Sequence, residues 1–423
     1  MSVQRFVDPR APLPRPDWVR EINREGGIWR EAGMLSDMVP LDPESLLAAA
    51  RRETGLDDFG AGDWREALEV LTGALESEAD LNLMGRLCTR SELILWLRNR
   101  LKLVDLVARH PEIAEEPIEA PIFITGLPRT GTSILQELLW QDPRLRTPLF
   151  WETLHPVESA RSGGRDEAAR RSGDALIRQW IRVTPEIQTM HETAGDLPAE
   201  DATVWAYTLV SDHIQSFYQM PTYDAYVNAA DPVPLYRAQK LFFQALQWRS
   251  SRRRWFGKTL YHLGHLPALF EVYPDARVIH THRDPIRSMA SVTNLLRAFY
   301  WQRSDRDFDA PGFEEITTGA GTADRLEAVM RLRDEGAVPA DRIVDSRYQD
   351  LMDDPVGSIE RLYGALKIPY DDEVGARVRR YLDHKPKHKH GVHRYKGLPP
   401  DELAKVRPLF RRYQARYGVP DET

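Results

Sequence analysis

The feature that most constrains the fold is the stretch PIFITGLPRTGTSIL, residues 121–135. Its first half is a short, nearly continuous apolar run, which is typical of a parallel strand buried on both faces. A glycine-rich turn from Gly126 to Ser133 follows, and the apolar spacing after it predicts a helix that begins near Thr132. A buried strand, a tight turn and a helix are the repeating unit of a parallel α/β sheet.

Two later segments have the same character. ARVIHTHRDP and DRIVDSRY each predict a buried strand that ends in a polar turn, and helical patterns separate all three strands. This alternation predicts an α/β fold with three layers and a mainly parallel sheet, as in P-loop proteins. Up to about Glu119 the apolar residues recur at spacings of three and four, so we expect a helical N-terminal region over 1–118 and an α/β domain over 119–423.

Charge and hydropathy narrow the range of partners. The formal net charge of -7 argues against a broad basic surface for nucleic acid or an anionic polysaccharide. The N-terminal stretch MSVQRFVDPRAPLPRPDWVR has no apolar run like that of a signal peptide, so we expect a cytoplasmic protein. Three basic residues interrupt ELILWLRNRLKLVDLV, which predicts an amphipathic core helix in place of a transmembrane segment. The sequence does not decide between a monomer and a homo-oligomer.

The turn after the first strand has the chemistry of an anion site. Gly126 and Gly131 let the backbone curl closely, and the helix that follows points its free N–H groups and positive dipole end at the same place. Arg129 adds a guanidinium suited to phosphate or sulfate oxygens. The turn also carries three hydroxyl donors: Thr130, Thr132 and Ser133.

The same turn departs from an ATP-binding P-loop at one position. A P-loop has a lysine directly after its second glycine, and here Thr132 follows Gly131. A sulfuryl group carries less negative charge than a terminal phosphoryl group, so a cationic side chain can suffice for it and we expect no metal. A P-loop kinase that uses ATP and a non-catalytic nucleotide-binding protein are the alternatives.

A second constellation lies about 150 residues later, in HTHRDPIRSMASV. Arg283 follows a predicted strand, and Ser291 lies eight residues further on, about two helical turns along a helix that begins near Pro285. Both side chains can reach one anion if the helix crosses the end of the strand obliquely. A third segment, SRYQDLMDDP, contains Tyr348.

These segments resemble the sulfotransferases that use 3'-phosphoadenosine 5'-phosphosulfate (PAPS), over roughly residues 119–400. GLPRTGTSILQELLWQDP resembles their 5'-phosphosulfate loop, most closely the G-L-P-R-[ST]-G-T form of bacterial members. HRDPIRSMAS matches R-[DN]-P-x5-S, which binds the 3'-phosphate, and YQDLMDDP is similar to a segment whose tyrosine lies near adenine. The resemblance implies PAPS as cofactor and these cofactor-binding residues: Arg129, Thr130, Gly131, Thr132, Ser133, Arg283, Ser291 and Tyr348.

The resemblance leaves two candidates for the catalytic base. WFGKTLYHLGHLP is similar to a segment of the cytosolic enzymes that contains a lysine and, two residues later, a catalytic histidine. Lys258 matches the lysine, but Leu260 stands at the position of the histidine, and the next histidine is His262, two residues further on. Membrane-bound members carry a glutamate at about the distance of Glu152 from the loop. We therefore expect Arg129 and Lys258 in catalysis, with His262 or Glu152 as base.

The acceptor is less well specified. WAYTLVSDHIQSFYQMPTYDAY, residues 205–226, concentrates aromatic and aliphatic side chains that can line an apolar pocket, although such a stripe is equally typical of core. With the negative net charge, this favours a small or lipid-like alcohol or phenol as acceptor. The basic tail 384–397 does not match the late R-K-G cofactor segment of the family cleanly, and we assign it no role.

Overall fold

A five-stranded parallel sheet, with the order β2-β3-β1-β4-β5, lies at the centre of the α/β part of the chain. The computed structural model describes residues 14–190, 192–251, 253–306, 308, 314–385 and 398–422. The strands are β1 (Ile122–Gly126), β2 (Leu145–Arg146), β3 (Arg254–Lys258), β4 (Arg277–His282) and β5 (Ile343–Arg347). The three strands predicted from the sequence are β1, β4 and β5, so the predicted α/β fold is confirmed.

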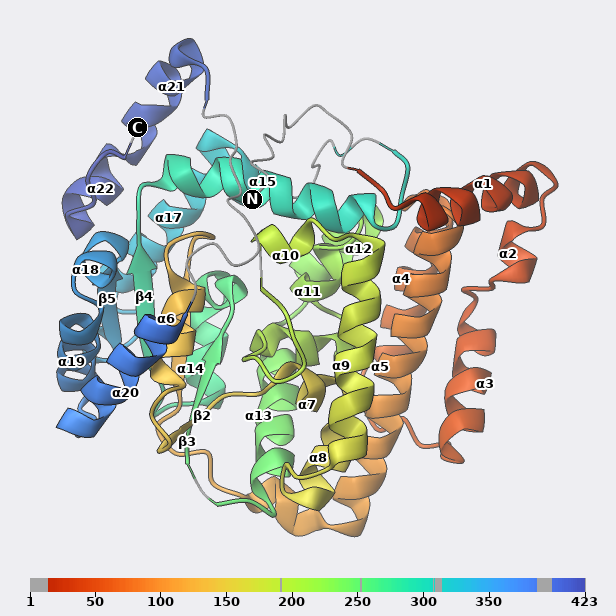
Figure 1. Ribbon diagram of the computed structural model, residues 1–423, viewed down its shortest axis with the longest axis horizontal. Coiled ribbons are helices and arrows are strands. Elements are labelled where there is room, and N and C mark those ends of the chain that lie inside the picture. Colours follow the sequence, from red (N-terminus) through yellow and green to blue (C-terminus); the bar gives the residue numbers. More distant parts are fainter. Residues whose placement is uncertain are drawn as a thin grey trace.

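The central strand β1 is buried on both faces, which explains its unbroken apolar sequence. Ile122 and Ile124 pack on one face together with helices α6 (Thr132–Leu139), α19 (Pro355–Leu366) and α20 (Asp372–His384). Phe123 packs on the opposite face, which α13 (Val233–Gln247), α14 (Leu266–Val272) and α17 (Gly319–Asp334) cover. Helices on both faces of the sheet give the predicted three layers (Figure 1).

The N-terminal region is helical, as predicted. Its elements are α1 (Asp17–Glu31), α2 (Leu35–Met38), α3 (Pro43–Thr54), α4 (Trp64–Ser77), α5 (Leu83–Arg109) and the 3-10 helix η1 (Pro111–Glu115). Apolar side chains of α3, α4, α5 and η1 belong to the same buried cluster as Phe123 of β1 and Val278 of β4. Among the described residues, α5 and the other helices offer no segment long and apolar enough to cross a bilayer.

A second group of helices joins the sheet to the N-terminal region (Figure 1). It comprises α7 (Phe150–Leu154), α8 (Pro156–Ser162), α9 (Glu167–Val183), α10 (Ile187–Met190), η2 (Asp201–Thr208), α11 (Asp212–Gln215), α12 (Pro221–Ala229) and η3 (Leu260–Gly264). The remaining elements are α15 (Pro285–Trp301), α16 (Glu314–Thr317), η4 (Ala340–Arg342), α18 (Tyr348–Asp353), α21 (Pro400–Val406), η5 (Arg407–Phe410) and α22 (Arg411–Tyr417).

Helix α15 begins where the sequence predicted, at Pro285. The side chain of Asp284 caps it by accepting a hydrogen bond from the Ile286 N–H at 3.1 Å, and proline suits the first helical position because no intrahelical partner is lost there. The helix runs from the end of β4 across the top of the molecule in Figure 1, toward α4 and α1. It therefore connects the carboxyl edge of the sheet with the N-terminal helices.

Candidate active site

The glycine loop between β1 and α6 has a fixed shape. The Thr130 hydroxyl donates to the Leu127 carbonyl at 2.6 Å and lies 2.6 Å from the Thr281 hydroxyl of β4, and the Thr130 side chain is fully buried. A Cβ atom at Gly126 would lie 2.3 Å from that same Thr281 hydroxyl, so this position requires glycine. Because the Thr130 hydroxyl holds the loop together, contact with an anion falls to its backbone.

The loop presents the first turn of α6 as an anion site. Gly131 precedes the helix with a φ of +90°, a left-handed conformation that favours glycine. Thr132 and Ser133 begin the helix and are half-buried, and the first N–H groups of a helix have no partner within it. Arg129 is exposed at the tip of the loop, also with a positive φ, and its guanidinium reaches toward the Met190 carbonyl of α10 at 3.5 Å.

Arg283 lies against this loop although 150 residues separate them in the sequence. Its Nη1 donates to the Arg129 carbonyl at 3.0 Å, and its guanidinium stacks 3.8 Å from the ring centre of Tyr348. The Tyr348 ring in turn lies beside Gly131, where an added Cβ would come within 3.0 Å of it. The structure thus brings together the loop, the guanidinium and the aromatic ring that the sequence patterns singled out.

Ser291 is the remaining candidate for the 3'-phosphate site. It lies within α15 and is buried. Its membership of the cofactor site remains a prediction.

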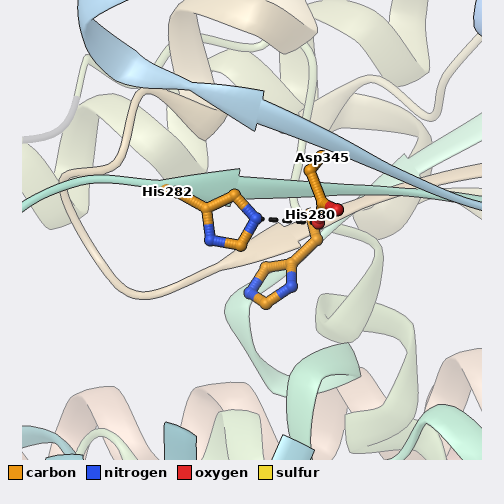
Figure 2. A group of neighbouring side chains, drawn as sticks. All are labelled: His280, His282 and Asp345. Carbon is orange, nitrogen blue, oxygen red and sulfur yellow. Dashed lines mark hydrogen bonds and ion pairs between the residues drawn. The ribbon is translucent and has the colours of Figure 1, made fainter. Parts of the chain in front are cut away.

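A buried cluster behind Arg283 fixes the end of β4. Figure 2 shows His282 of β4 facing Asp345 of β5, with His282 Nε2 and the carboxylate 2.9 Å apart, and the ring of His280 beside that of His282. His282 Nδ1 pairs with the Tyr413 hydroxyl at 2.9 Å, and Tyr413 also accepts a hydrogen bond from the backbone of Arg283. The cluster therefore supports the strand end that carries Arg283.

The three side chains of this cluster lie close enough to hold a metal ion, but Asp345 already has a cationic partner. Arg333 donates to both of its oxygens, at 2.6 and 2.9 Å. Burial opposes ionisation of Asp345, yet hydrogen bonds from His282 and Arg333 hold its pKa below the usual range. Burial also lowers the pKa of His280 well below 6.5, so this imidazole is neutral at pH 7. We interpret the cluster as an ion-paired support.

An apolar cavity of about 180 Å³ lies near the loop, although no loop residue is part of its lining. Two segments connect the cavity with the loop. Leu260 lines the cavity, and its carbonyl accepts a hydrogen bond from the Thr125 hydroxyl, just before Gly126. Helix α10 contributes Ile187 to the cavity lining and the Met190 carbonyl to the contact with Arg129. Most of the lining is apolar or aromatic, with side chains from α5, α9, α11 and α15. The N-terminal region contributes Glu92 and Trp96 of α5.

One carboxylate lies where the cavity meets the carboxyl edge of the sheet. Glu200 lines the cavity, and its Oε1 accepts a hydrogen bond from Lys258 Nζ at 2.5 Å. Its Oε2 accepts from the Thr259 hydroxyl at 3.1 Å. Lys258 is the last residue of β3 and pairs in register with Ile124 of β1, so Glu200 and the glycine loop share one edge of the sheet. Sequence reasoning missed Glu200 because no motif surrounds it.

His213 of α11 is a second polar group in the cavity wall. Burial lowers its pKa to about 4, against the opposing effect of Glu200, so its ring is neutral at pH 7. The ring packs edge-on against Phe217 with the ring centres 4.8 Å apart, and within the described part of the chain it has no hydrogen-bond partner. His213 belongs to the aromatic stretch 205–226, in which His213, Ser216 and Phe217 line the cavity whereas Trp205 and Tyr223 are core.

His262 has a structural environment. Its ring is fully buried in η3, with Nδ1 2.9 Å from the Tyr236 hydroxyl and Nε2 3.0 Å from Asp201. Both nitrogens are therefore engaged, and neither faces the cavity, whose lining from this segment is Leu260 and Tyr261. The geometry does not support His262 as the base.

We expect replacement of His262 by Ala to act on stability. The change leaves Asp201 and Tyr236 buried with fewer partners, so the free energy of unfolding should fall by about 2–4 kcal/mol. His265→Ala is a matched control, since His265 pairs with Asp212 at a half-buried position and should cost about 1 kcal/mol. Urea denaturation measures both, and equal losses would contradict this assignment.

Glu152 also has a structural role, because its carboxylate is bound by neighbouring groups of the fold. Its carboxylate is buried and accepts hydrogen bonds from Arg146 at 3.0 Å, the Ser159 hydroxyl at 2.9 Å and the Leu149 N–H at 3.0 Å. Its neighbours Phe150 and Thr153 line the cavity, but Glu152 does not. The geometry does not support it as the base either. Of the basic tail 384–397, residues 386–397 lie outside the described residues.

The sequence and the architecture resemble those of known proteins. A model described as "Sulfotransferase family" matches residues 121–372. The chain is 30% identical over 297 residues to the omega-hydroxy-beta-dihydromenaquinone-9 sulfotransferase Stf3 of Mycobacterium bovis, covering 64% of this chain and 69% of the relative. The Mycobacterium tuberculosis protein of the same name matches equally.

Two solved structures are similar over nearly the whole chain. Sulfotransferase STF9 from Mycobacterium avium has a TM-score of 0.74 and 25% identity, covering 90% of this chain and 97% of that one. Sulfotransferase STF1 from Mycobacterium tuberculosis has a TM-score of 0.70 and 27% identity, covering 88% and 98%. Because the family model spans more than half of the sequence and these structures share its fold, the chain belongs to the sulfotransferase family.

Proposed function

We propose that this protein is an enzyme that transfers the sulfuryl group of PAPS to a hydroxyl group of a small or lipid-like acceptor. The observation that carries the proposal is the convergence of the glycine loop with Arg283 and Tyr348 beside an apolar cavity that has Glu200 in its wall. The loop, Arg283 and Tyr348 suit a 3'-phosphorylated adenine nucleotide, and the cavity with Glu200 suits an apolar alcohol.

The donor site fits PAPS by its chemistry. Gly126 and Gly131 keep the loop free of side chains, and the N-terminus of α6 offers N–H groups to the 5'-phosphosulfate. Arg283 offers a planar fork for the 3'-phosphate, and Tyr348 offers a ring for adenine. Thr132 stands where a kinase has its lysine, and we propose that Arg129 supplies the cation without a metal.

PAPS supplies the activated sulfuryl group, so that a new bond forms between the acceptor oxygen and sulfur while the bond from sulfur to the phosphate oxygen breaks. Glu200 takes the proton from the acceptor hydroxyl as it attacks. Lys258 and Thr259 hold the Glu200 carboxylate in place. Arg129 and the α6 N–H groups stabilise the negative charge that develops on the departing phosphate.

The cavity indicates the acceptor class. Its walls are mostly apolar, and its polar groups include Glu200 at the sheet edge and the neutral His213. An alcohol with an apolar body would bury that body in the cavity and direct its hydroxyl toward these groups. The relative Stf3, whose name refers to a hydroxylated menaquinone, supports a lipid-like acceptor.

The test is transfer of radiolabelled sulfate from PAPS to a panel of alcohols and phenols. We expect sulfation of apolar members, with KM falling as the apolar chain lengthens and fills the cavity. Absence of transfer to every member, by protein that binds 3'-phosphoadenosine 5'-phosphate (PAP), would contradict the proposed activity. Preference for short polar alcohols would contradict the acceptor class.

Narrowing the cavity should weaken binding of the acceptor without affecting binding of the donor. Val292→Phe introduces a larger side chain into the lining from α15 and should raise KM for a long-chain alcohol about 10-fold or more. Thr293→Phe is the matched control, because Thr293 is the next residue of the same helix and is not part of the lining. Steady-state kinetics compare the two variants, and an equal effect of both would contradict the assignment of this cavity to the acceptor.

A further inference from the structure

The carboxylate of Glu422 lies against the guanidinium of Arg283. Arg283 Nε is 2.9 Å from each Glu422 oxygen, and Arg283 Nη2 is 2.7 Å from Oε2. Both side chains are largely buried, with exposed fractions of 16% and 20%. The guanidinium to which we assign the 3'-phosphate of the donor therefore already binds an anionic group of the chain itself.

The segment that carries Glu422 is held in place by several contacts. Val419 is buried in the main apolar cluster. Asp421 accepts hydrogen bonds from Arg411 at 3.1 Å and from Gln414 at 2.8 Å. The Glu422 N–H donates to the Asp284 carboxylate at 2.9 Å, and the Glu422 carbonyl accepts from Arg287 at 2.7 Å. The position of Glu422 is thus set by the first turn of α15 and by α22.

This environment is the one that a phosphate group would use. It combines the planar fork of Arg283, the cation of Arg287 and the start of α15, and all three favour an anion. The Nε and Nη2 donors of Arg283 cannot serve the Glu422 carboxylate and a phosphate at once. The ring of Tyr348, stacked on the same guanidinium, restricts the directions from which a second anion can approach.

We propose that Glu422 acts as an intramolecular competitor of the donor's 3'-phosphate, so that cofactor binding requires the release of this carboxylate from Arg283. The inference rests on the proposed function, because it assumes that Arg283 binds that phosphate. The apparent affinity for the donor is then lower than the intrinsic affinity, because only molecules in which Arg283 and Glu422 are separated can bind it. The contact is therefore autoinhibitory and regulates the donor site.

Glu422→Gln tests the competition, because it removes the charge and keeps the size of the side chain. Calorimetric titration should show that PAP binds about 3- to 30-fold more tightly to this variant than to the parent. The affinity for AMP, which lacks the 3'-phosphate, should not change. Glu402→Gln is the matched control, because it makes the same chemical change at an exposed position of α21 and should leave both affinities unchanged.

Each other outcome overturns the inference in a distinguishable way. PAP affinity that is unchanged or weaker in Glu422→Gln would mean that the carboxylate is irrelevant to the donor or orients Arg283 for it, while the proposed function stands. An equal gain for PAP and AMP would place the effect away from the 3'-phosphate. Failure of the parent and both variants to bind PAP would contradict the proposed function and the competition together.

Discussion

Replacing Glu200 by Gln should lower kcat for sulfuryl transfer by about 10²- to 10⁴-fold, because the amide cannot accept the proton of the acceptor hydroxyl. Affinity for PAP should remain within about 2-fold of the parent, since the change removes a group that acts only on the acceptor side. The amide keeps an oxygen for the hydrogen bond from Lys258, so the local structure should persist. Single-turnover kinetics with saturating PAPS measure the effect.

Glu152→Gln is the informative comparison for this prediction. It makes the same change at the carboxylate that sequence spacing suggested, but there the carboxylate is bound by Arg146 and Ser159. We expect lower thermal stability and nearly normal kcat per folded molecule. A normal rate for Glu200→Gln together with a collapsed rate for Glu152→Gln would transfer the role of base to Glu152.

Replacing Arg283 by Ala should weaken PAP binding by about 100-fold, because a charge-assisted, bidentate contact contributes about 1.5–3 kcal/mol. The affinity for AMP should change far less, because AMP has no group at this position. Calorimetry with both nucleotides measures the difference. Arg347→Ala is a control, since this exposed arginine near Tyr348 pairs with Asp350 at 2.8 Å and makes no contact that the donor site needs.

Part of the loss in Arg283→Ala should come from Glu422, which would remain near the site without its partner and repel a phosphate. The double variant Arg283→Ala with Glu422→Gln separates the two contributions. We expect it to recover some affinity for PAP, but not that of the parent. Full recovery would show that Arg283 serves only to neutralise Glu422, and would contradict its role in donor binding.

The sequence was sufficient to predict the core of the fold because its local signals agreed. The strand, turn and helix around Gly126–Ser133 and the capped start of α15 at Pro285 depend on neighbouring residues alone, and both were placed correctly. Strands β2 and β3 were not predicted. β2 has only two residues, and in β3 the charged residues Arg254 and Lys258 flank a short segment, so neither shows the long apolar run that identified the other strands.

The donor side of the candidate site was also largely accessible from sequence. Residues at the carboxyl ends of adjacent parallel strands converge whatever their separation along the chain, and this is why Arg283 meets the loop at Arg129. The family patterns then singled out the residues. The interaction of Arg283 with Glu422 was not predictable, because it depends on how α22 packs near the start of α15.

The acceptor side depends on tertiary contacts that no local pattern encodes. His262 has a suitable chemistry, but the structure buries it between Tyr236 and Asp201, and a sequence does not reveal which nitrogens are engaged. Glu200 is positioned by hydrogen bonds from Lys258 and Thr259, which lie 58 and 59 residues away in the sequence. Likewise, α5 lines the cavity because it packs beside elements far from it in the sequence.

The most direct test of the central claim is a calorimetric comparison of PAP with AMP and with ATP and Mg²⁺ on the intact protein. If the loop, Arg283 and Tyr348 form the donor site of a PAPS-dependent sulfotransferase, PAP should bind at least about 10-fold more tightly than either other nucleotide, because it alone supplies a 3'-phosphate to Arg283. Tighter binding of ATP and Mg²⁺ than of PAP would contradict the account and point to phosphoryl transfer.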